Sequence, residues 1–199
     1  MILSKIEEPY NEKHKQIIQT GQKLFFKHGI KRVTVEEICR EANVSKMTFY
    51  KHFRNKNELA KEIIRLILDI QMAKYREFMD RTDITFEEKI RQTIQMKMEG
   101  TRDISAAYFD DYVIHTDPEL AEFIQVESAK VYREVLKDYT EAQKRGDIRK
   151  DIKPEFIQFF LNHILEMAKD EKLLALYGHP QKLIMELVNF FFYGIMNPK

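Results

Sequence analysis

The stretch from Thr34 to Phe53, TVEEICREANVSKMTFYKHF, contains the signals that decide the fold of this chain. Thr34 is a favoured residue at a helix start, and Glu37 follows at the spacing of a capping box. Asn43 tolerates left-handed backbone and can end that helix. Ser45 then starts a second helix that runs to about Phe53. Two short helices joined by a three-residue turn predict a helix-turn-helix.

The rest of the chain also has helical patterning. Apolar residues recur at helical spacing, and no alternating strand pattern is present. Six glycines and five prolines are few for this length, and several stand where a helix should begin or end. We therefore expect an all-α fold with helices over about 11–28, 34–42, 45–53 and 56–79, one after Thr85, one over 118–145, and two that Pro154 and Pro180 open.

The composition fits a soluble globular protein. The chain has 199 residues, of which 44% are hydrophobic and 33% charged. No apolar run reaches the roughly 18 residues that a membrane span needs, so no membrane partner is expected. The amino-terminal residues lack a signal-peptide core, and the cytoplasm is the expected compartment. The single cysteine excludes an internal disulfide framework.

The charge is divided unevenly along the chain. Residues 1–60 contain 12 Lys and Arg against 7 Asp and Glu, a net +5, and the remaining residues contain 21 against 25, a net −4. A basic amino-terminal part suggests that this part meets a polyanion.

The predicted helix-turn-helix has two distinct faces. Ile38, Ala42, Val44, Phe49 and Phe53 can form one buried side. The other side can enter a major groove, which admits one α-helix. On charge alone a solvated basic helix is the simpler interpretation, but the capped spacing favours DNA. The predicted DNA-binding residues are Thr34, Ser45, Lys46, Met47, Thr48, Tyr50, Lys51, His52 and Lys56.

Within this set we expect different roles. Lys46 can reach a guanine edge, and Thr48 can offer its hydroxyl or methyl group to a base. Tyr50, Lys51 and His52 are better placed for the phosphates. Lys56 stands at a helix start, which itself favours an anion.

Residues 21–60, GQKLFFKHGIKRVTVEEICREANVSKMTFYKHFRNKNELA, resemble the amino-terminal domain of TetR-family transcriptional regulators. The family pattern is matched in order and spacing over roughly residues 10–60. Three positions depart from it: Asn43 stands where the family usually has glycine, Gly21 where it often has alanine, and Met47 where it often has glycine or a small residue. A side chain as long as that of Met47 at this position would change which bases the second helix prefers.

The resemblance implies an all-α second domain that dimerises and holds an inducer. We therefore expect a DNA-binding domain over 1–55 and an effector-binding and dimerisation domain over 56–199, with the helix 56–79 connecting them. The segments 155–177 and 180–196 are apolar around much of their circumference, which predicts a homodimer through them. The alternative is that one subunit buries both. A two-fold dimer would read palindromic double-stranded DNA.

Aromatic and methionine residues suggest where an effector binds. An adaptable apolar cavity with a few polar groups would suit an apolar or amphipathic small molecule. Each such residue can equally be plain core. The candidates are Met96, Tyr108, Phe109, Tyr112, Phe123, Tyr132, His163 and Met167.

Catalysis and metal binding are not expected. Asp111 with His115, and His163 with Glu166, have the spacing of a shared helix face, but a helical di-iron site needs two Glu-x-x-His repeats and two further carboxylates. No catalytic motif is present. No cofactor or metal is therefore predicted, and the chain should not be an enzyme.

The sequence thus predicts a one-component, ligand-responsive transcriptional repressor of unknown effector. Two alternatives stay open. One is a DNA-binding co-regulator that has no small-molecule effector, and the other is a helical metal-binding or enzymatic module.

Overall fold

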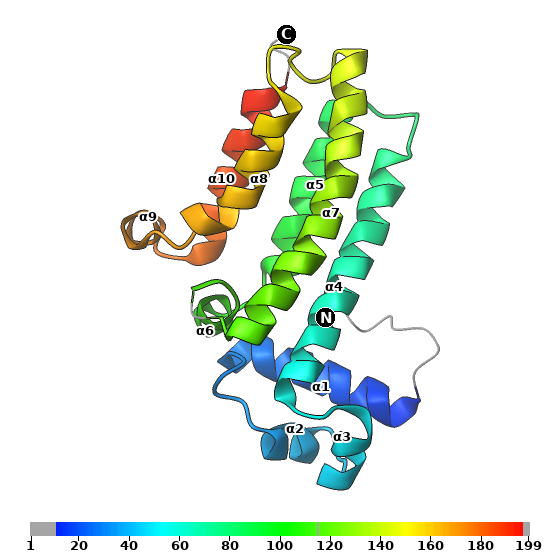
Figure 1. Cartoon of the computed structure of the whole chain (residues 1–199), viewed down its shortest axis with the longest axis vertical. Helices are drawn as coiled ribbons and strands as arrows, with labels where there is room; N and C mark the ends of the chain where they lie inside the picture. Colours follow the sequence, from blue (N-terminus) through cyan, green and yellow to red (C-terminus); the bar gives the residue numbers. More distant parts are fainter. Residues whose placement is uncertain (1–10, 115, 197–199) are drawn as a thin grey trace. The chain divides into compact units, whose positions relative to one another are not determined.

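The computed structural model describes residues 11–114 and 116–196, and the regular elements in this part of the chain are helical. Figure 1 shows them coloured along the chain. They are α1 Glu12–His28, α2 Val35–Glu41, α3 Lys46–His52, α4 Lys56–Met79, α5 Phe86–Thr101, α6 Ala106–Phe109, the π-helical turn η2 Asp110–Ile114, α7 Pro118–Arg145, α8 Pro154–Met167, α9 Glu171–Tyr177 and α10 Pro180–Ile195. The described residues contain no strand, and an isolated bridge joins Ile148 to Met196. The predicted all-α fold is confirmed.

The chain forms two compact units. The first contains the described residues up to Ile70 together with Asp103–Glu127, and the second contains Gln71–Arg102 and the described residues from Ser128 onward. The helices α4 and α7 each supply residues to both units. The predicted boundary between residues 55 and 56 falls inside the first unit, and that functional division stays a prediction.

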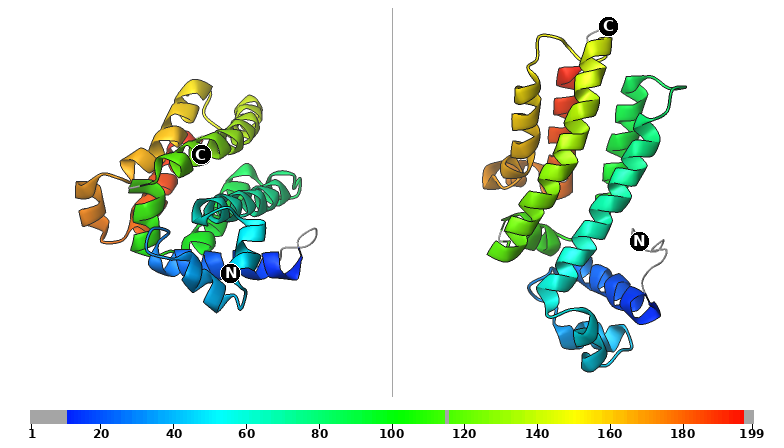
Figure 2. Two further views of the ribbon diagram at one scale, coloured as in Figure 1. Left: turned by 60° about the horizontal axis from the view of Figure 1, so that its bottom comes forward. Right: turned by 45° about the vertical axis from the view of Figure 1, so that its right-hand side comes forward.

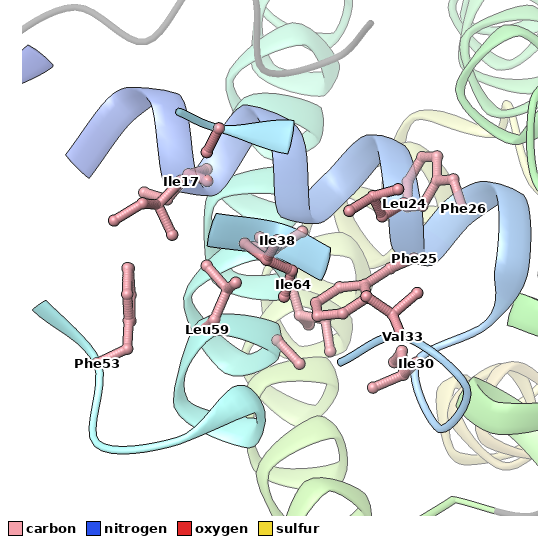
Figure 3. Close-up of a cluster of buried hydrophobic side chains, with 14 of the residues drawn as sticks. Ile17, Leu24, Phe25, Phe26, Ile30, Val33, Ile38, Phe53, Leu59 and Ile64 are labelled. Atoms are coloured by element: carbon pink, nitrogen blue, oxygen red, sulfur yellow. The ribbon is translucent and has the colours of Figure 1, made fainter. Parts of the chain in front are cut away.

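The core of the first unit forms where α1, α2, α3 and the start of α4 meet (Figure 3). Ile17 and Phe25 of α1 are fully buried beside Leu59 of α4. Gly21 lets α1 approach α4 closely, since a Cβ at this position would lie 2.8 Å from the Leu59 Cδ2 atom and 3.2 Å from the Ile63 Cδ1 atom. Close packing therefore explains this glycine, which is otherwise unfavourable inside a helix.

The core of the second unit surrounds Tyr139 of α7. Its ring centroid lies 6.2 Å from that of Phe86 of α5 and 6.1 Å from that of Phe192 of α10. Phe160 of α8 stacks on Phe191 of α10 at 5.2 Å. Figures 1 and 2 show α8 and α10 side by side, as this ring contact requires. Aromatic packing therefore joins four helices of this unit, which is typical of a helical bundle core.

Most predicted helix ends are confirmed. Gly29 ends α1 with φ 83°, and Pro154 and Pro180 stand at the starts of α8 and α10. Two expectations are wrong. The segment 155–177 is not one helix, because α8 ends at Met167 and the Asp170 side chain accepts hydrogen bonds from the first N–H groups of α9.

The second error is an omission, since the apolar pattern of the sequence does not predict α6 and η2. Ser105 starts α6 by accepting a hydrogen bond from the Tyr108 N–H at 3.2 Å. The helix has four residues before the wider π-helical turn begins. Elements this short contain too few residues for apolar periodicity to be visible.

Candidate nucleic-acid interface

Local hydrogen bonds form the two short helices of the predicted helix-turn-helix. The Thr34 hydroxyl accepts a hydrogen bond from the Glu37 N–H at 3.1 Å, and the Ser45 hydroxyl accepts one from the Thr48 N–H at 3.0 Å. Asn43, in the turn between α2 and α3, has φ 51°. Each of these residues does what the sequence predicted.

Buried side chains hold α3 against the rest of the first unit. Phe49 and Ile38 have no exposed surface, and Ala42 and Phe53 are also buried. The ring centroids of Phe49 and Phe53 lie 5.7 Å apart. The predicted inner face is confirmed, so the opposite face of α3 is turned outward.

The outward face of α3 displays large side chains that are mostly exposed. Met47 is 72% exposed and Tyr50 is 55% exposed. Lys46 and Lys51 are also exposed, whereas Thr48 and His52 are half-buried. The Thr48 hydroxyl lies 2.9 Å from the Ser45 hydroxyl, so capping already engages both. An exposed methionine and tyrosine beside lysines form a surface suited to a partner with negative charge and apolar edges.

Lys46, the first residue of α3, forms an ion pair with Glu36 of α2. This hydrogen bond raises the pKa of Lys46 and lowers the pKa of Glu36. Both side chains are more than half exposed, so solvent weakens the pair. An incoming base edge or phosphate can therefore displace Glu36, but it must compete with this carboxylate.

Lys56, at the start of α4, is placed differently from the other predicted contacts. Its ammonium donates to the Lys31 carbonyl at 2.8 Å and to the Val33 carbonyl at 2.7 Å. Burial lowers its pKa, an effect that Asp111 opposes. Lys56 thus braces the segment between α1 and α2, and one of its three N–H groups is left for another acceptor.

A second side chain, which no sequence pattern predicted, holds the same segment. The Asp111 carboxylate in η2 is buried and accepts a hydrogen bond from the Lys31 N–H at 2.8 Å. A Cβ at Gly29 would lie 2.6 Å from the Asp111 Oδ2 atom. From the sequence, Asp111 is a candidate only for a metal site shared with His115, which lies outside the described residues. Within the described residues, no group of three potential metal ligands occurs.

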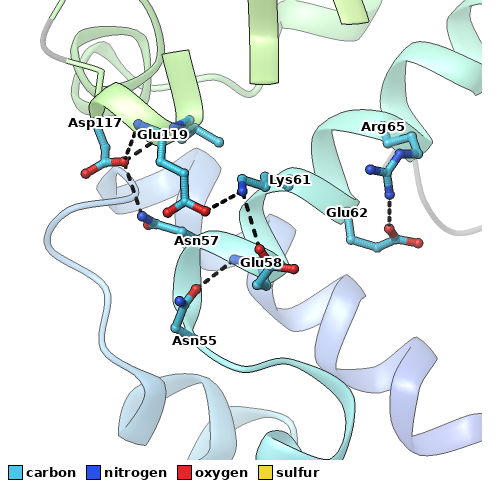
Figure 4. A network of polar contacts seen from close by, with 9 residues as sticks. Asn55, Asn57, Glu58, Lys61, Glu62, Arg65, Asp117 and Glu119 are labelled. Atoms are coloured by element: carbon cyan, nitrogen blue, oxygen red, sulfur yellow. Dashed lines mark hydrogen bonds and ion pairs between the residues drawn. The ribbon is translucent and has the colours of Figure 1, made fainter. Parts of the chain in front are cut away.

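Polar side chains also connect the start of α4 with the start of α7 (Figure 4). The Lys61 ammonium donates to Glu119 at 2.5 Å and to Glu58 at 3.3 Å. The Asn57 amide donates to Asp117, the residue that caps α7, at 3.3 Å. These bonds, together with those of Lys56 and Asp111 to the segment between α1 and α2, hold the helix-turn-helix to the rest of the first unit.

His52, at the end of α3, lies beside a second histidine. The ring centroids of His52 and His14 of α1 are 5.0 Å apart. Burial lowers the pKa of His14, and His52 lowers it further, against the opposing effect of Glu62. The neutral form of His14 is therefore favoured beside the end of α3.

The predicted effector residues are divided between the two units. Tyr108 and Phe109 are buried in the first unit, where Tyr112 and Phe123 are half-buried. Met96, Tyr132 and Met167 are half-buried in the second unit. His163 is exposed, and its ring stacks on Phe159 at 4.0 Å with Nδ1 2.7 Å from the Phe159 carbonyl oxygen. Their role in effector binding stays a prediction.

A recess of about 400 Å³ lies in the first unit. Its polar lining consists of Lys31, Lys56, Asn57, Asp111, Thr116 and Asp117. None of the eight predicted effector residues lines it. The charged groups around it are those that brace the helix-turn-helix, so its polar character follows from that role.

Comparison with known proteins identifies the helix-turn-helix. Residues 17–63 match the family described as bacterial regulatory proteins, tetR family. Over these residues the chain is similar to the tetR family. The matched segment runs from α1 into α4 and so includes the whole of α2 and α3. The resemblance noted from the sequence is confirmed.

Curated relatives are matched over part of their length. The HTH-type transcriptional regulator YerO of Bacillus subtilis is 28% identical over 133 residues, which cover 63% of this chain and 46% of YerO. The HTH-type transcriptional repressor KstR2 of Mycobacterium tuberculosis is 26% identical over 80 residues, which cover 40% of each chain. The chain thus spans less than half the length of these relatives. They are named as regulators, in agreement with the expectation that this chain is not an enzyme.

Solved structures share the fold over almost the whole chain. The fatty acid degradation regulator FadR of Bacillus halodurans superposes with a TM-score of 0.73 at 16% identity, covering 94% of this chain and 98% of FadR. A putative regulator of Saccharomonospora viridis, in complex with choline, superposes with a TM-score of 0.69 at 15% identity, covering 94% and 99%. At these identities the likeness concerns the fold. None of the described helices of this chain is long and apolar enough to cross a bilayer.

Proposed function

We propose that this protein is a one-component transcriptional repressor of the tetR family that binds palindromic operator DNA as a homodimer and leaves it when a small molecule binds. The observation that carries the proposal is the outward face of α3. This face presents Met47, Tyr50 and Lys51 to solvent while Phe49 anchors the helix from behind.

The chemistry of this face fits a major groove. The apolar Met47 side chain can contact a thymine methyl group, and Tyr50 and Lys51 can donate to phosphate oxygens. Lys46 can exchange its bond to Glu36 for a guanine edge. Phosphate contacts would set the position of α3, and Lys46 and Met47 would discriminate between bases.

Exposed aromatic residues support the homodimer. Phe156 and Phe159 of α8 are 55% and 60% exposed, and Phe190 and Tyr193 of α10 are 72% and 69% exposed. Large exposed aromatics on two adjacent helices are typical of an interaction surface. A second copy is the simplest partner, because a palindrome requires two recognition helices related by a two-fold axis.

Release would depend on α4 and α7, which contribute to both units. An effector that shifts the second unit would move the start of α4. There Lys56 donates a hydrogen bond to the Val33 carbonyl and Lys61 donates one to Glu119. A coupling of about 3 kcal/mol would change operator affinity about 150-fold. The choline complex of the Saccharomonospora viridis protein is one case of this fold with a small molecule.

Selection of bound duplexes from a random DNA pool tests the proposal. We expect the wild type to enrich a palindrome and Tyr50→Ala to lose the enrichment. Leu176→Ala, which truncates an exposed residue of α9, is the control and should enrich the same palindrome. Failure of the wild type to enrich any sequence, or enrichment that Tyr50→Ala leaves intact, would show that α3 does not read DNA.

A further inference from the structure

The recess of the first unit lies where four segments of the chain meet. It has a volume of about 400 Å³, and its lining residues come from the segment between α1 and α2, from η2 and from the starts of α4 and α7. All of these residues belong to the first unit. Small-molecule sites in proteins have volumes of about 300–1,000 Å³. The recess is therefore large enough to hold a small ligand within one unit.

Two lysines supply hydrogen-bond donors to the recess. Lys56 donates two of its N–H groups to backbone carbonyls, so one of the three remains for a ligand within the described part of the chain. The Lys31 ammonium lies 3.9 Å from the Asp111 Oδ1 atom, which is too far for a hydrogen bond. Both ammonium groups can therefore donate to a bound carboxylate.

Oxygen acceptors line the recess beside these lysines. As Figure 4 shows, the Asp117 Oδ1 atom accepts hydrogen bonds from the Asn57 amide and from backbone N–H groups of α7. Among the described residues, no hydrogen bond reaches the other carboxylate oxygen of Asp117. The Asn57 side-chain carbonyl and the Thr116 hydroxyl oxygen are further acceptors in the lining. This side of the recess can therefore accept hydrogen bonds from a bound ammonium group.

The charges around the recess are balanced. Lys31 and Lys56 each carry one positive charge, and two carboxylates of the lining oppose them. One is Asp111, which is 8% exposed and is fixed by the Lys31 N–H at 2.8 Å, and the other is Asp117. A purely anionic ligand would meet both carboxylates, and a purely cationic ligand would meet both ammonium groups. A ligand that carries one charge of each sign can pair each charge with its opposite.

We propose that this recess binds a free α-amino acid with an apolar side chain. The ammonium groups of Lys31 and Lys56 would pair with its carboxylate. Asp117 and the Asn57 carbonyl oxygen would accept hydrogen bonds from its ammonium group. Lys56 and Asn57 are consecutive residues, which suits a ligand whose carboxylate and ammonium group are attached to one carbon atom.

The apolar part of the lining favours an apolar side chain on the ligand. Burial of such a side chain against it would add to the affinity. A charged side chain would lack a further partner of opposite sign, because the four charges of the lining already serve each other and the two charged groups of the ligand. The apolar lining residues are Ile30, Pro118 and Leu120.

A ligand at this place would act directly on the helix-turn-helix. It would join the starts of α4 and α7 to Lys31, which belongs to the segment that leads into α2. The recess contains none of the predicted effector residues, so this ligand would be a second one beside the effector. The inference goes beyond the proposed function, and its test requires neither DNA nor a dimer.

Calorimetric titration of the full chain with three matched probes tests the assignment. The probes are L-leucine, 4-methylpentanoate, which is leucine without the ammonium group, and 3-methylbutylamine, which is leucine without the carboxylate. All three share the branched apolar chain. We expect leucine to bind, and each of the other two to bind roughly tenfold to a hundredfold more weakly because each lacks one charge-assisted set of hydrogen bonds.

Two charge-removing variants test the two ends of the site. Asp117→Asn keeps an oxygen that can cap α7, and should weaken leucine roughly tenfold while reducing its advantage over 4-methylpentanoate. Lys31→Gln should weaken leucine to a similar degree and reduce its advantage over 3-methylbutylamine. The matched controls Asp103→Asn and Lys27→Gln alter exposed residues of the first unit outside the recess, and should bind leucine like the wild type.

The design keeps the test independent of folding. Both recess variants leave the bonds of Lys56 to the backbone and of Asp111 to the Lys31 N–H in place, and thermal unfolding without ligand checks that they are folded. Three outcomes would overturn the site. They are no leucine binding at about millimolar concentration, leucine affinity no greater than that of both single-charge probes, and leucine affinity that the recess variants change no more than the controls do.

Discussion

At the scale of single residues, Gly29 shows how one position connects backbone and side-chain requirements. Its φ of 83° and ψ of 159° place it in a region that is essentially restricted to glycine, and the Asp111 carboxylate occupies the space of a Cβ. Gly29→Ala should lower the free energy of unfolding by about 1–3 kcal/mol from backbone strain, with an added loss from displaced Asp111. Urea unfolding followed by circular dichroism measures this change.

Gly178 supplies the matched control for that substitution. It ends α9 with φ 66°, and a Cβ there would meet no atom within 4 Å. Gly178→Ala should therefore cost only the left-handed backbone strain, about 1–2 kcal/mol. Equal losses for the two variants would mean that Asp111 does not constrain Gly29.

Lys97 gives a prediction about pH at the same scale. Its folded-state pKa is lowered, so the unfolded chain binds more protons between that pKa and the ordinary value for lysine. This contribution makes stability rise with pH across that window. Lys97→Met removes it, and should be more stable than the wild type at neutral pH with a difference that shrinks toward about pH 10. Urea midpoints of both proteins from about pH 7 to about pH 10 measure the difference.

Lys182→Met is the reference for this comparison because it removes the same single ammonium charge from α10. The difference between the two variants at each pH is the quantity to be explained. A Lys97→Met curve parallel to that of the wild type would show that the Lys97 ammonium pays no desolvation penalty.

At the scale of elements, the pairing of α2 with α3 affects how strongly α3 can bind DNA. Glu36 holds Lys46 and places a negative charge beside the surface that would face phosphates. Glu36→Gln should raise operator affinity several-fold at low salt and steepen the salt dependence by up to about one unit, since Lys46 then becomes a free cation. Fluorescence anisotropy with the selected operator at several salt concentrations measures both quantities.

Glu41→Gln is the control for this substitution. Glu41 also belongs to α2 and is exposed, but its ion pair is with its neighbour Arg40 at 3.5 Å. The charge change is the same in both variants. If the two variants gain affinity equally, general charge and not the release of Lys46 explains the effect.

At the scale of the whole molecule, the exposed aromatics of α8 and α10 predict the oligomeric state. Phe190→Glu should convert a dimer into a monomer, because a charge without a partner is costly inside an interface. The monomer should also lose the selective binding of a palindrome. Sedimentation velocity measures the first effect and anisotropy the second.

Val126→Glu places the same charge on an exposed residue of α7. It should remain dimeric and bind DNA like the wild type. A wild type that sediments as a monomer at micromolar concentration would contradict the dimer proposal directly.

The amino-acid sequence by itself determined the helical fold and the helix-turn-helix, because their signals are local. Thr34, Ser45 and Asn55 each accept a hydrogen bond from an N–H three residues later, so the chain shows these helix starts without any tertiary contact. The inner face of α3 was predictable for the same reason, since helical spacing brings Phe49 and Phe53 together. Short elements such as α6 and η2 were missed because they contain too little of this local pattern.

Only the tertiary structure decided which charged side chains are held by other groups of the chain. Lys46 is held by Glu36, 10 positions away, and Lys56 by carbonyl oxygens 25 and 23 positions away. Asp111 reaches the Lys31 N–H across 80 positions. Charge pairing depends on distances in space between segments that are remote in sequence. Composition and spacing could therefore place the recognition helix, but not the groups that restrain it.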